Sequence, residues 1–143
     1  MNELDSLKLE NQLCFLLYAS SRELTKKYKP LLEELDVTYP QYLVLLLLWE
    51  HKSLSVKEMG NYLYLDSGTL TPMLKRMEQQ QLLQRKRSLE DERSVLITLT
   101  DKGASLQQKA ACIPTEVFKL FGKSDEEITE LKQSLLKLLQ NLT

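Results

Sequence analysis

Apolar residues recur every three or four positions along most of the chain, which is the pattern of amphipathic helices. The first such stretch covers residues 4–35, and a segment that is apolar on all sides follows from Pro40 to about His51. Proline fits the first turn of a helix, and a helix without a polar face belongs in a core. The pattern therefore predicts a long amphipathic helix and then a central, buried one.

Two short helices are expected after the buried one. Ser55 and Glu58 have the spacing of a capping box, which predicts a helix from Val56 to about Leu63. Asp66 or Ser67 can cap the next helix, since a short side-chain oxygen accepts one of the free N–H groups of the first turn. The apolar side of that next helix consists of Leu70, Met73, Leu74 and Met77. Two short helices joined by a tight turn are typical of a helix-turn-helix.

Residues 83–99 have the spacing of β-strands. Leu83–Arg87 and Ser94–Leu99 are predicted strands, and the second alternates its inward and outward positions in steps of two. Its inward positions are Val95, Ile97 and Leu99. Residues 88–93 between the strands are mostly charged or polar, as in an exposed turn. The segment therefore predicts an antiparallel hairpin with a charged tip.

The C-terminal third is helical again. A helix that begins at Thr100 or Asp101 is interrupted at Pro114, and a capping box of Ser124 and Glu127 starts the last helix. That last helix has a heptad-like apolar stripe of Ile128, Leu131, Leu135, Leu138 and Leu142. The sequence thus predicts one domain of 143 residues, mainly α-helical with a small β-hairpin. The apolar helices of about 4–35 and 101–143 are expected to form a dimerisation layer, because their stripes are too extensive for a monomer's surface.

The second helix of the pair and the hairpin carry a local positive charge. From Thr71 to Arg87, five cations accompany the single carboxylate of Glu78, a local net charge of +4 on a chain whose total is −1. A helix with small polar and cationic side chains suits the major groove of duplex DNA, and a basic hairpin can follow the backbone to the minor groove. The candidate DNA-binding residues are Ser67, Thr69, Thr71, Lys75, Arg76, Arg85, Lys86, Arg87, Asp91 and Arg93. A solvated surface helix beside a hairpin would show the same run of charge.

Composition excludes several other classes. The chain has no run of 18 apolar residues, and its N-terminus is polar and acidic, so we expect a cytoplasmic protein without a membrane segment. One histidine and two cysteines cannot supply a four-ligand zinc site, so neither a metal nor another cofactor is expected. In a reducing cytosol the two cysteines, Cys14 and Cys112, are free thiols unless something oxidises them.

One long motif resembles a known family. The run LDSGTLTPMLKRME, followed by DERSV with Asp91 and Arg93 in the hairpin tip, is similar to the winged helix-turn-helix of the MarR family of bacterial transcription regulators. It resembles most narrowly the organic-hydroperoxide-sensing repressors of that family, and the similarity is strong from Asn11 to about Thr100. The resemblance implies a winged helix-turn-helix in about 40–100, a homodimer, a double-stranded DNA operator, and no enzymatic activity. We expect Arg93 to enter the minor groove and Asp91 to hold its guanidinium.

Cys14 gains a role from the resemblance. By periodicity alone it is a small core residue, and Cys112 an inert one. Cys14 falls, however, where the hydroperoxide sensors carry their reactive thiol, and Tyr18, Tyr28 and Tyr39 match the tyrosines that surround it. Cys112 lies where some of those relatives have a second, resolving cysteine. Because 14 positions separate Cys14 from Tyr28, roughly 21 Å along one helix, they can meet only across a dimer.

Three functions follow from these observations. In the first, a reduced repressor binds its operator and releases it when an organic hydroperoxide converts Cys14 to a sulfenic acid. In the second, a small aromatic ligand releases the repressor and Cys14 is structural. In the third, the chain is a thiol peroxidase and its basic hairpin is incidental, although no C-x-x-C motif is present to accompany such turnover.

Overall fold

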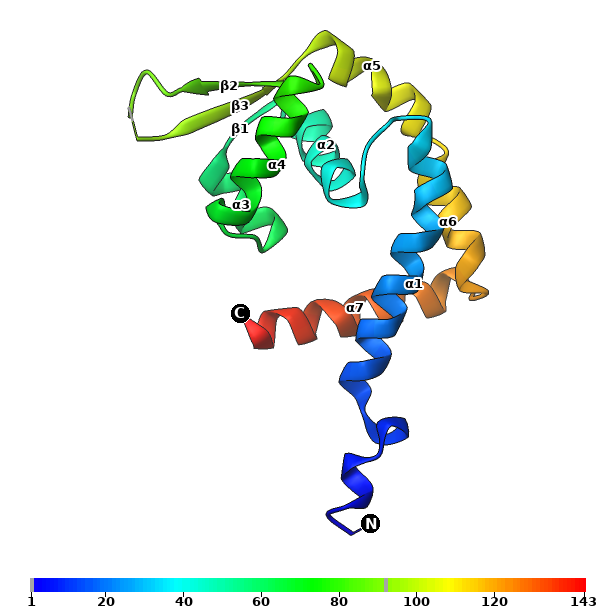
Figure 1. Cartoon of the computed structure of the whole chain (residues 1–143). Coiled ribbons are helices and arrows are strands. Elements are labelled where there is room, and N and C mark those ends of the chain that lie inside the picture. The colour runs from blue at the N-terminus through cyan, green and yellow to red at the C-terminus, as the bar shows by residue number, and fades with distance from the viewer. Residues whose placement is uncertain (1, 92) are drawn as a thin grey trace. The chain divides into compact units, whose positions relative to one another are not determined.

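The computed structural model describes residues 2–91 and 93–143, which fall into two compact units, Met1–Ala110 and Ala111–Thr143 (Figure 1). The elements of the first unit are η1 (Asp5–Leu7), η2 (Leu9–Asn11), α1 (Leu13–Glu33), α2 (Tyr39–His51), β1 (Ser53–Ser55), α3 (Val56–Leu63), α4 (Ser67–Gln79), β2 (Leu83–Arg87), β3 (Val95–Leu99) and α5 (Asp101–Ala110). Those of the second are α6 (Ile113–Phe121) and α7 (Asp125–Leu142). The mainly helical fold with a small β-hairpin is as predicted.

The first helix begins later than the sequence pattern indicates. Two turns of 3₁₀-helix, η1 and η2, precede α1, and the backbone is extended at Lys8 and Gln12. The carbonyls of Asp5 and Lys8 accept backbone N–H groups three residues later, as in 3₁₀-helices, and they also accept side-chain amides: Asn11 donates to Asp5 at 2.6 Å and Gln12 to Lys8 at 3.0 Å. Such side chains offer the backbone an alternative to a helix, so the prediction of one helix from residue 4 was wrong. Pro30 lies inside α1, which continues to Glu33.

Helix α2 forms the centre of the first unit. Thr38 caps it in a full capping box with Gln41, a signal that the sequence reading missed. Val44, Leu45 and Leu48 are completely buried, as predicted, but Leu46 is 40% exposed, so the helix is not buried on every side as the all-apolar pattern indicated.

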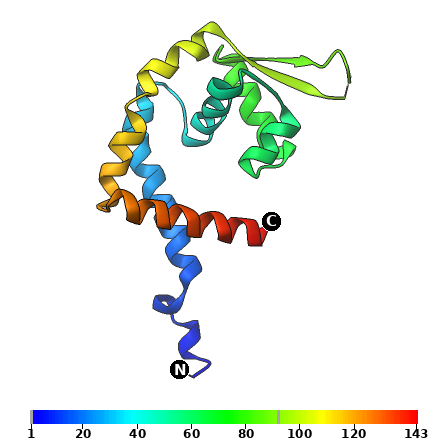
Figure 2. The ribbon, with the colours of Figure 1, turned by 180° about the vertical axis from the view of Figure 1, so that it is seen from behind.

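Helices α3 and α4 form the predicted helix-turn-helix, side by side in both views (Figures 1 and 2). The capping box of Ser55 and Glu58 is present, and Asp66 rather than Ser67 caps α4 by accepting the Thr69 N–H at 2.7 Å. The turn requires a glycine at position 60, because a Cβ there would lie 2.6 Å from the carbonyl oxygen of Leu65. The buried side of α4 consists of Leu70, Leu74 and Met77.

Strands β2 and β3 form the predicted hairpin, and β1 adds a third antiparallel strand in the order β1-β3-β2. Figure 1 shows β2 and β3 reaching beyond β1 as a two-stranded arm. Strand β3 begins at Val95 and not at Ser94, because Ser94 belongs to the tip: its N–H bonds to the Asp91 carbonyl and its carbonyl accepts from Ser88. The sheet therefore presents a long hairpin beside the helix-turn-helix.

The second unit contains two helices. Pro114 lies in the first turn of α6, where its missing N–H costs nothing, so the predicted interruption separates α5 from α6. The capping box of Ser124 and Glu127 opens α7 as expected. Several leucines of α7 are exposed in the single chain, namely Leu131, Leu135, Leu136 and Leu142. No helix among the described residues is long and apolar enough to cross a membrane.

Candidate nucleic-acid interface and thiol site

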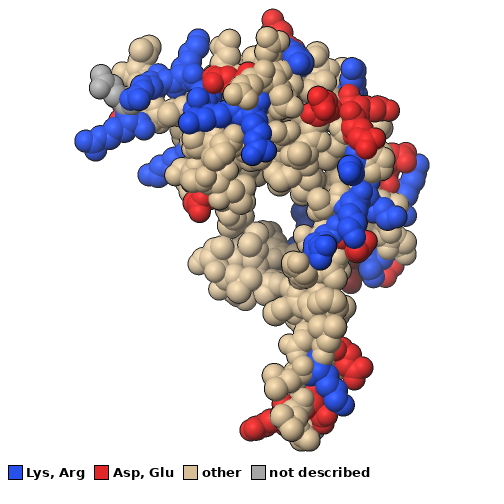
Figure 3. Space-filling view, viewed as in Figure 1, with Lys and Arg blue, Asp and Glu red and all other residues tan. Residues whose placement is uncertain are grey.

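Helix α4 buries its apolar side chains on one face, so its outward face carries short polar and cationic side chains. Thr69, Lys75 and Arg76 are exposed, and Thr71 is half-buried. In the space-filling view, Lys and Arg side chains gather around the hairpin and beside α4, with few carboxylates among them (Figure 3). The elements therefore bring the predicted polar and cationic residues of α4 and the hairpin to one region of the first unit.

A groove of about 580 Å³ lies between the helix-turn-helix and the hairpin. Its polar lining residues are Lys57, Asn61, Asp66, Ser67, Thr71, Asp91, Arg93 and Ser94. The sequence reading missed Lys57 and Asn61, which lie one turn apart on α3 and are exposed. Their i,i+4 spacing places them on one face, but only the fold shows that this face meets the hairpin.

Asp91 and Arg93, in the hairpin tip, are joined by a hydrogen bond. The Asp91 carboxylate accepts the Arg93 N–H at 3.0 Å, a local bond typical of Asx turns. Asp91 thus holds the backbone of Arg93, whereas the sequence reading assigned it to the guanidinium. Both side chains are exposed. Arg93 therefore combines an exposed side chain with a backbone N–H that is bonded to Asp91.

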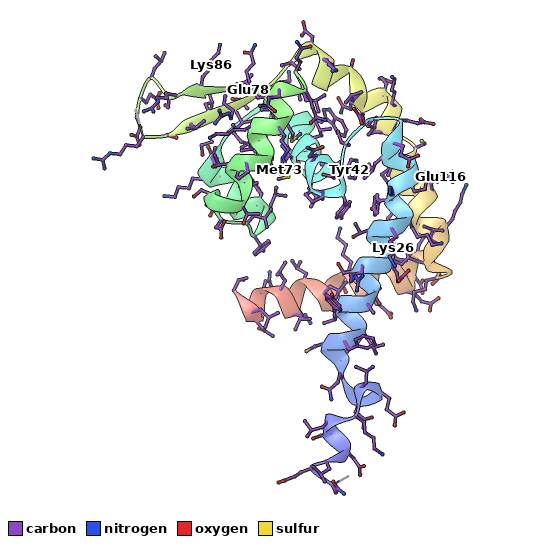
Figure 4. The ribbon with its side chains drawn as sticks, viewed as in Figure 1. Lys26, Tyr42, Met73, Glu78, Lys86 and Glu116 are labelled. Atoms are coloured by element: carbon purple, nitrogen blue, oxygen red, sulfur yellow. The ribbon has the colours of Figure 1, made fainter. Side chains whose placement is uncertain are left out.

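Arg85 is bound to α4. The Glu78 carboxylate accepts the Arg85 backbone N–H at 2.9 Å and its Nε at 3.3 Å, and the first of these bonds lowers the pKa of Glu78. Figure 4 labels Glu78 on α4 and Lys86 on the neighbouring strand β2. This contact, the Glu78–Arg85 clamp, ties α4 to β2 and engages one of the predicted DNA-binding cations.

Cys14 lies in the first turn of α1 and is exposed as a free thiol. Tyr18, one turn later, is 60% exposed, and the Arg22 guanidinium lies 5.5 Å from the centre of its ring. Tyr28 is on the same continuous helix as Cys14, 14 positions away. Among the described residues, no hydrogen bond or ring contact joins Cys14 to Tyr28 or Tyr39.

Tyr28 and Tyr39 meet instead in a tyrosine cluster that includes Tyr42. The ring centres are 4.7 Å apart for Tyr28 and Tyr39, and 5.9 and 6.2 Å apart for the pairs with Tyr42. Burial, with smaller contributions from the two neighbouring phenols, raises the pKa of Tyr28 to about 12. The sequence reading missed Tyr42, which is 4% exposed and follows Tyr39 by one helical turn (Figure 4). All three phenols are therefore protonated at neutral pH and can donate hydrogen bonds.

The second cysteine, Cys112, is exposed just before α6. Groups of three or more histidine, cysteine or acidic side chains that could hold a metal are absent from residues 2–91 and 93–143.

Comparison with known proteins decides the family. Residues 26–110 match the family model described as transcriptional regulator SarA/Rot. The chain belongs to this family of transcriptional regulators. A relative from Bacillus subtilis (strain 168), the organic hydroperoxide resistance transcriptional regulator, is 66% identical over 99% of this chain and 96% of its own length. This SarA/Rot regulator thus resembles proteins that control transcription, not enzymes.

Solved structures confirm the MarR-type winged helix fold of this SarA/Rot regulator. AbfR of Staphylococcus epidermidis is 37% identical, covers 98% of this chain and 97% of its own, and has a TM-score of 0.77. AbfR has also been solved on DNA in reduced and overoxidized forms, and in a disulfide form. The MepR–DNA complex of S. aureus is 26% identical, covers 91% of this chain and 98% of its own, and has a TM-score of 0.81.

Proposed function

We propose that this regulator is a cytoplasmic, homodimeric repressor that binds a pseudo-palindromic operator when reduced and releases it when an organic hydroperoxide oxidises Cys14. The observation that carries the proposal is the 66% identity, over nearly the whole chain, to an organic hydroperoxide resistance regulator. The exposed thiol on α1 supplies the group that such a response needs.

The DNA-binding half of the proposal rests on α4 and the hairpin. Helix α4 fits the major groove with its polar face, while the β2–β3 arm follows the phosphate backbone and presents Arg93 to the minor groove. Lys57 and Asn61 line the groove between these two elements, where the phosphate backbone that separates the two DNA grooves would pass. MepR, with a similar fold, has been solved on DNA.

The sensing half rests on thiol chemistry. The Cys14 thiolate attacks one oxygen of the hydroperoxide, the O–O bond breaks, and the departing alkoxide takes a proton to leave as the alcohol. Sulfur is thereby oxidised to a sulfenic acid. Tyr28 is too far along α1 to assist Cys14 of its own chain, and Tyr39, at the start of α2, lies beside Tyr28. We therefore assign both to the partner subunit's site, where their protonated phenols donate to the thiolate.

The oxidation that matters is the reversible step. A sulfenic acid can be restored by thiols, whereas sulfinic and sulfonic acids generally cannot. AbfR has been solved on DNA in its overoxidized form as well as in its reduced form. Operator release should therefore be tested with about one equivalent of hydroperoxide per thiol, so that higher oxidation states do not accumulate.

The test is operator binding with and without an organic hydroperoxide, measured on wild type, Cys14→Ser and Cys112→Ser. We expect hydroperoxide to release wild type and not Cys14→Ser, and a thiol reductant to restore binding. Release of Cys14→Ser by hydroperoxide would contradict the proposal. Equal release of wild type and Cys14→Ser by a small aromatic acid would favour a ligand-responsive repressor, and sustained peroxide consumption without operator binding would favour a peroxidase.

A further inference from the structure

The last residue of the helix-turn-helix reaches back to the connection between α1 and α2. Gln80 follows the final turn of α4, and its side-chain amide donates to the carbonyl of Asp36 at 3.3 Å. Its amide oxygen accepts from the side chain of Gln41 at 3.4 Å, across 39 positions of sequence. One side chain thus joins the end of α4 both to the α1–α2 connection and to the start of α2.

The Gln41 side chain cannot leave this contact without breaking a second hydrogen bond. It is 6% exposed, and its amide oxygen accepts the backbone N–H of Thr38 at 3.1 Å in the capping box of α2. Its oxygen therefore holds the start of α2, and its NH₂ group holds Gln80. A rotation of either amide by half a turn would bring like groups together and break these bonds.

The residues just after α4 are also held by Thr100 and by α5. Lys102 on α5 donates to the carbonyl of Gln80 at 2.8 Å, and Thr100, which precedes α5, donates to that of Gln81 at 2.6 Å. These two bonds are short, whereas the two bonds of the Gln80 side chain are near the long limit for a hydrogen bond. The side-chain bonds are therefore the ones that a small movement can break.

The α1–α2 connection is also where the tyrosine cluster begins. Tyr39 is the first residue of α2, directly after Thr38, and its ring lies 4.7 Å from that of Tyr28 on α1. Asp36, whose carbonyl Gln80 holds, has a left-handed backbone with a φ of 53°. A shift of the Tyr39 ring therefore acts on the short segment that carries both partners of Gln80.

We infer that Asp36, Gln41 and Gln80 form a latch that couples the tyrosine cluster to the position of the recognition helix α4. Gln41 and Gln80 are positioning residues: they touch neither the thiol nor, in this assignment, the operator. While the cluster is undisturbed, the latch holds α4 in its binding position. Displacement of Tyr39 on oxidation opens it and lets α4 move. The inference rests on the proposed redox response.

The test compares operator affinity in the reduced and oxidised states, at a salt concentration low enough for both to be measured. Gln80→Met keeps the length of the side chain and removes both latch bonds. Gln41→Glu keeps an acceptor for the Thr38 N–H and removes the donor to Gln80. We expect each to lower the ratio of oxidised to reduced Kd by at least about fivefold, a loss typical of one or two hydrogen bonds. The rate of Cys14 oxidation should not change.

Gln107→Met is the matched control, since Gln107 is an exposed glutamine on α5 outside the latch. It should keep the wild-type ratio. If Gln80→Met weakens operator binding by the same factor in both states, the ratio of oxidised to reduced Kd is unchanged. Gln80 would then have a purely structural role, and the inference would be overturned. If Gln80→Met does not fold, Gln41→Glu decides. A wild type that does not respond to hydroperoxide would overturn the proposed function and the latch together.

Discussion

Arg93, at the tip of the hairpin, combines an exposed guanidinium with a backbone N–H that is bonded to the Asp91 carboxylate. A cation there gains from the negative potential of a narrow, A·T-rich minor groove. We therefore expect Arg93→Ala to weaken operator binding at least tenfold, about 1.4 kcal/mol, while the thermal midpoint and hydroperoxide response stay unchanged. Fluorescence anisotropy with labelled operator measures this.

The control for Arg93 is Leu89→Ala, which removes an exposed side chain from the same tip without changing its charge. It should bind as wild type does. If Arg93→Ala also binds as wild type, the arginine is a solvated charge and the minor-groove assignment fails.

Tyr28 makes stability depend on pH in the alkaline range. Its pKa in the fold is about 12, above the ordinary value of about 10, so folding favours the protonated phenol. That contribution is complete below about pH 10 and is lost as the pH rises towards about 12. Tyr28→Phe should therefore flatten the fall of the thermal midpoint over this window, as measured by circular dichroism.

Tyr64→Phe is the comparison, because it removes an exposed phenol outside the cluster. Its midpoint should fall with pH as steeply as that of wild type. A Tyr28→Phe curve as steep as both would show that Tyr28 does not carry the dependence. Tyr39 and Tyr42, whose pKa values burial also raises, account for the slope that remains.

At the scale of elements, the Glu78–Arg85 clamp fixes how α4 meets β2. Glu78→Ala removes a negative charge beside DNA, so charge alone predicts tighter binding to any duplex. If the clamp sets the spacing between the recognition helix and the hairpin, specific binding should weaken while non-specific binding strengthens. We expect the ratio of specific to non-specific affinity to fall about tenfold, roughly 1.4 kcal/mol.

Glu90→Ala, in the hairpin tip, removes a carboxylate without touching the clamp, and it should raise both affinities together. Competition assays with operator and with unrelated duplex of equal length measure the specific and the non-specific affinity separately. If Glu78→Ala raises the specific and the non-specific affinity together, as Glu90→Ala does, then Glu78 acts only through its charge.

The elements that the sequence predicted are those with local signals. The box of Ser55 and Glu58 gave the start of α3, and that of Ser124 and Glu127 the start of α7. Strand β1 carried no such signal, because Ser53–Ser55 is short and mostly polar and exists only through its pairing with β3. Tertiary pairing, not local preference, makes that strand.

The candidate sites divide in the same way. The spacing along α1 correctly separated Cys14 from Tyr28, because helical rise alone determines that distance. Tyr42 and Lys57 could not be assigned to sites before the fold showed which elements face each other. The same holds for Arg85, whose partner Glu78 looked like a lone acid within a basic run.

At the scale of the whole molecule, a Cys112 variant tests whether the Cys14 thiol alone supports reversible release of the operator. The proposed chemistry needs only the sulfenic acid at Cys14, so Cys112→Ser should still release the operator after one equivalent of hydroperoxide and rebind after reduction. Non-reducing gels provide the check. A covalent dimer in wild type that disappears in both Cys14→Ser and Cys112→Ser, with loss of reversible release in Cys112→Ser, would show instead that a disulfide between subunits is the switch.

The exposed leucines of α1 and α7 predict that the chain works as a dimer. In the single chain, Leu16 on α1 is 58% exposed and Leu136 on α7 is 49% exposed. With the other exposed leucines of these helices, they form more apolar surface than a monomeric protein usually exposes. A two-fold dimer carries two copies of α4, so the operator should have two half-sites about one helical turn, roughly 10 bp, apart.

Sedimentation at micromolar concentration should therefore give a dimer, and Leu16→Glu should give a monomer whose operator affinity is lower by at least about a hundredfold, because one half-site contact is lost. The control is Lys8→Glu, which also introduces a glutamate near the start of the chain. Because Lys8 is not on the apolar stripe, this variant should remain dimeric. The logarithm of affinity should fall linearly with the logarithm of salt, with a shallower slope for Leu16→Glu, because one subunit neutralises fewer phosphates than two. A monomeric Leu16→Glu with wild-type affinity and slope would mean that one subunit suffices for the operator.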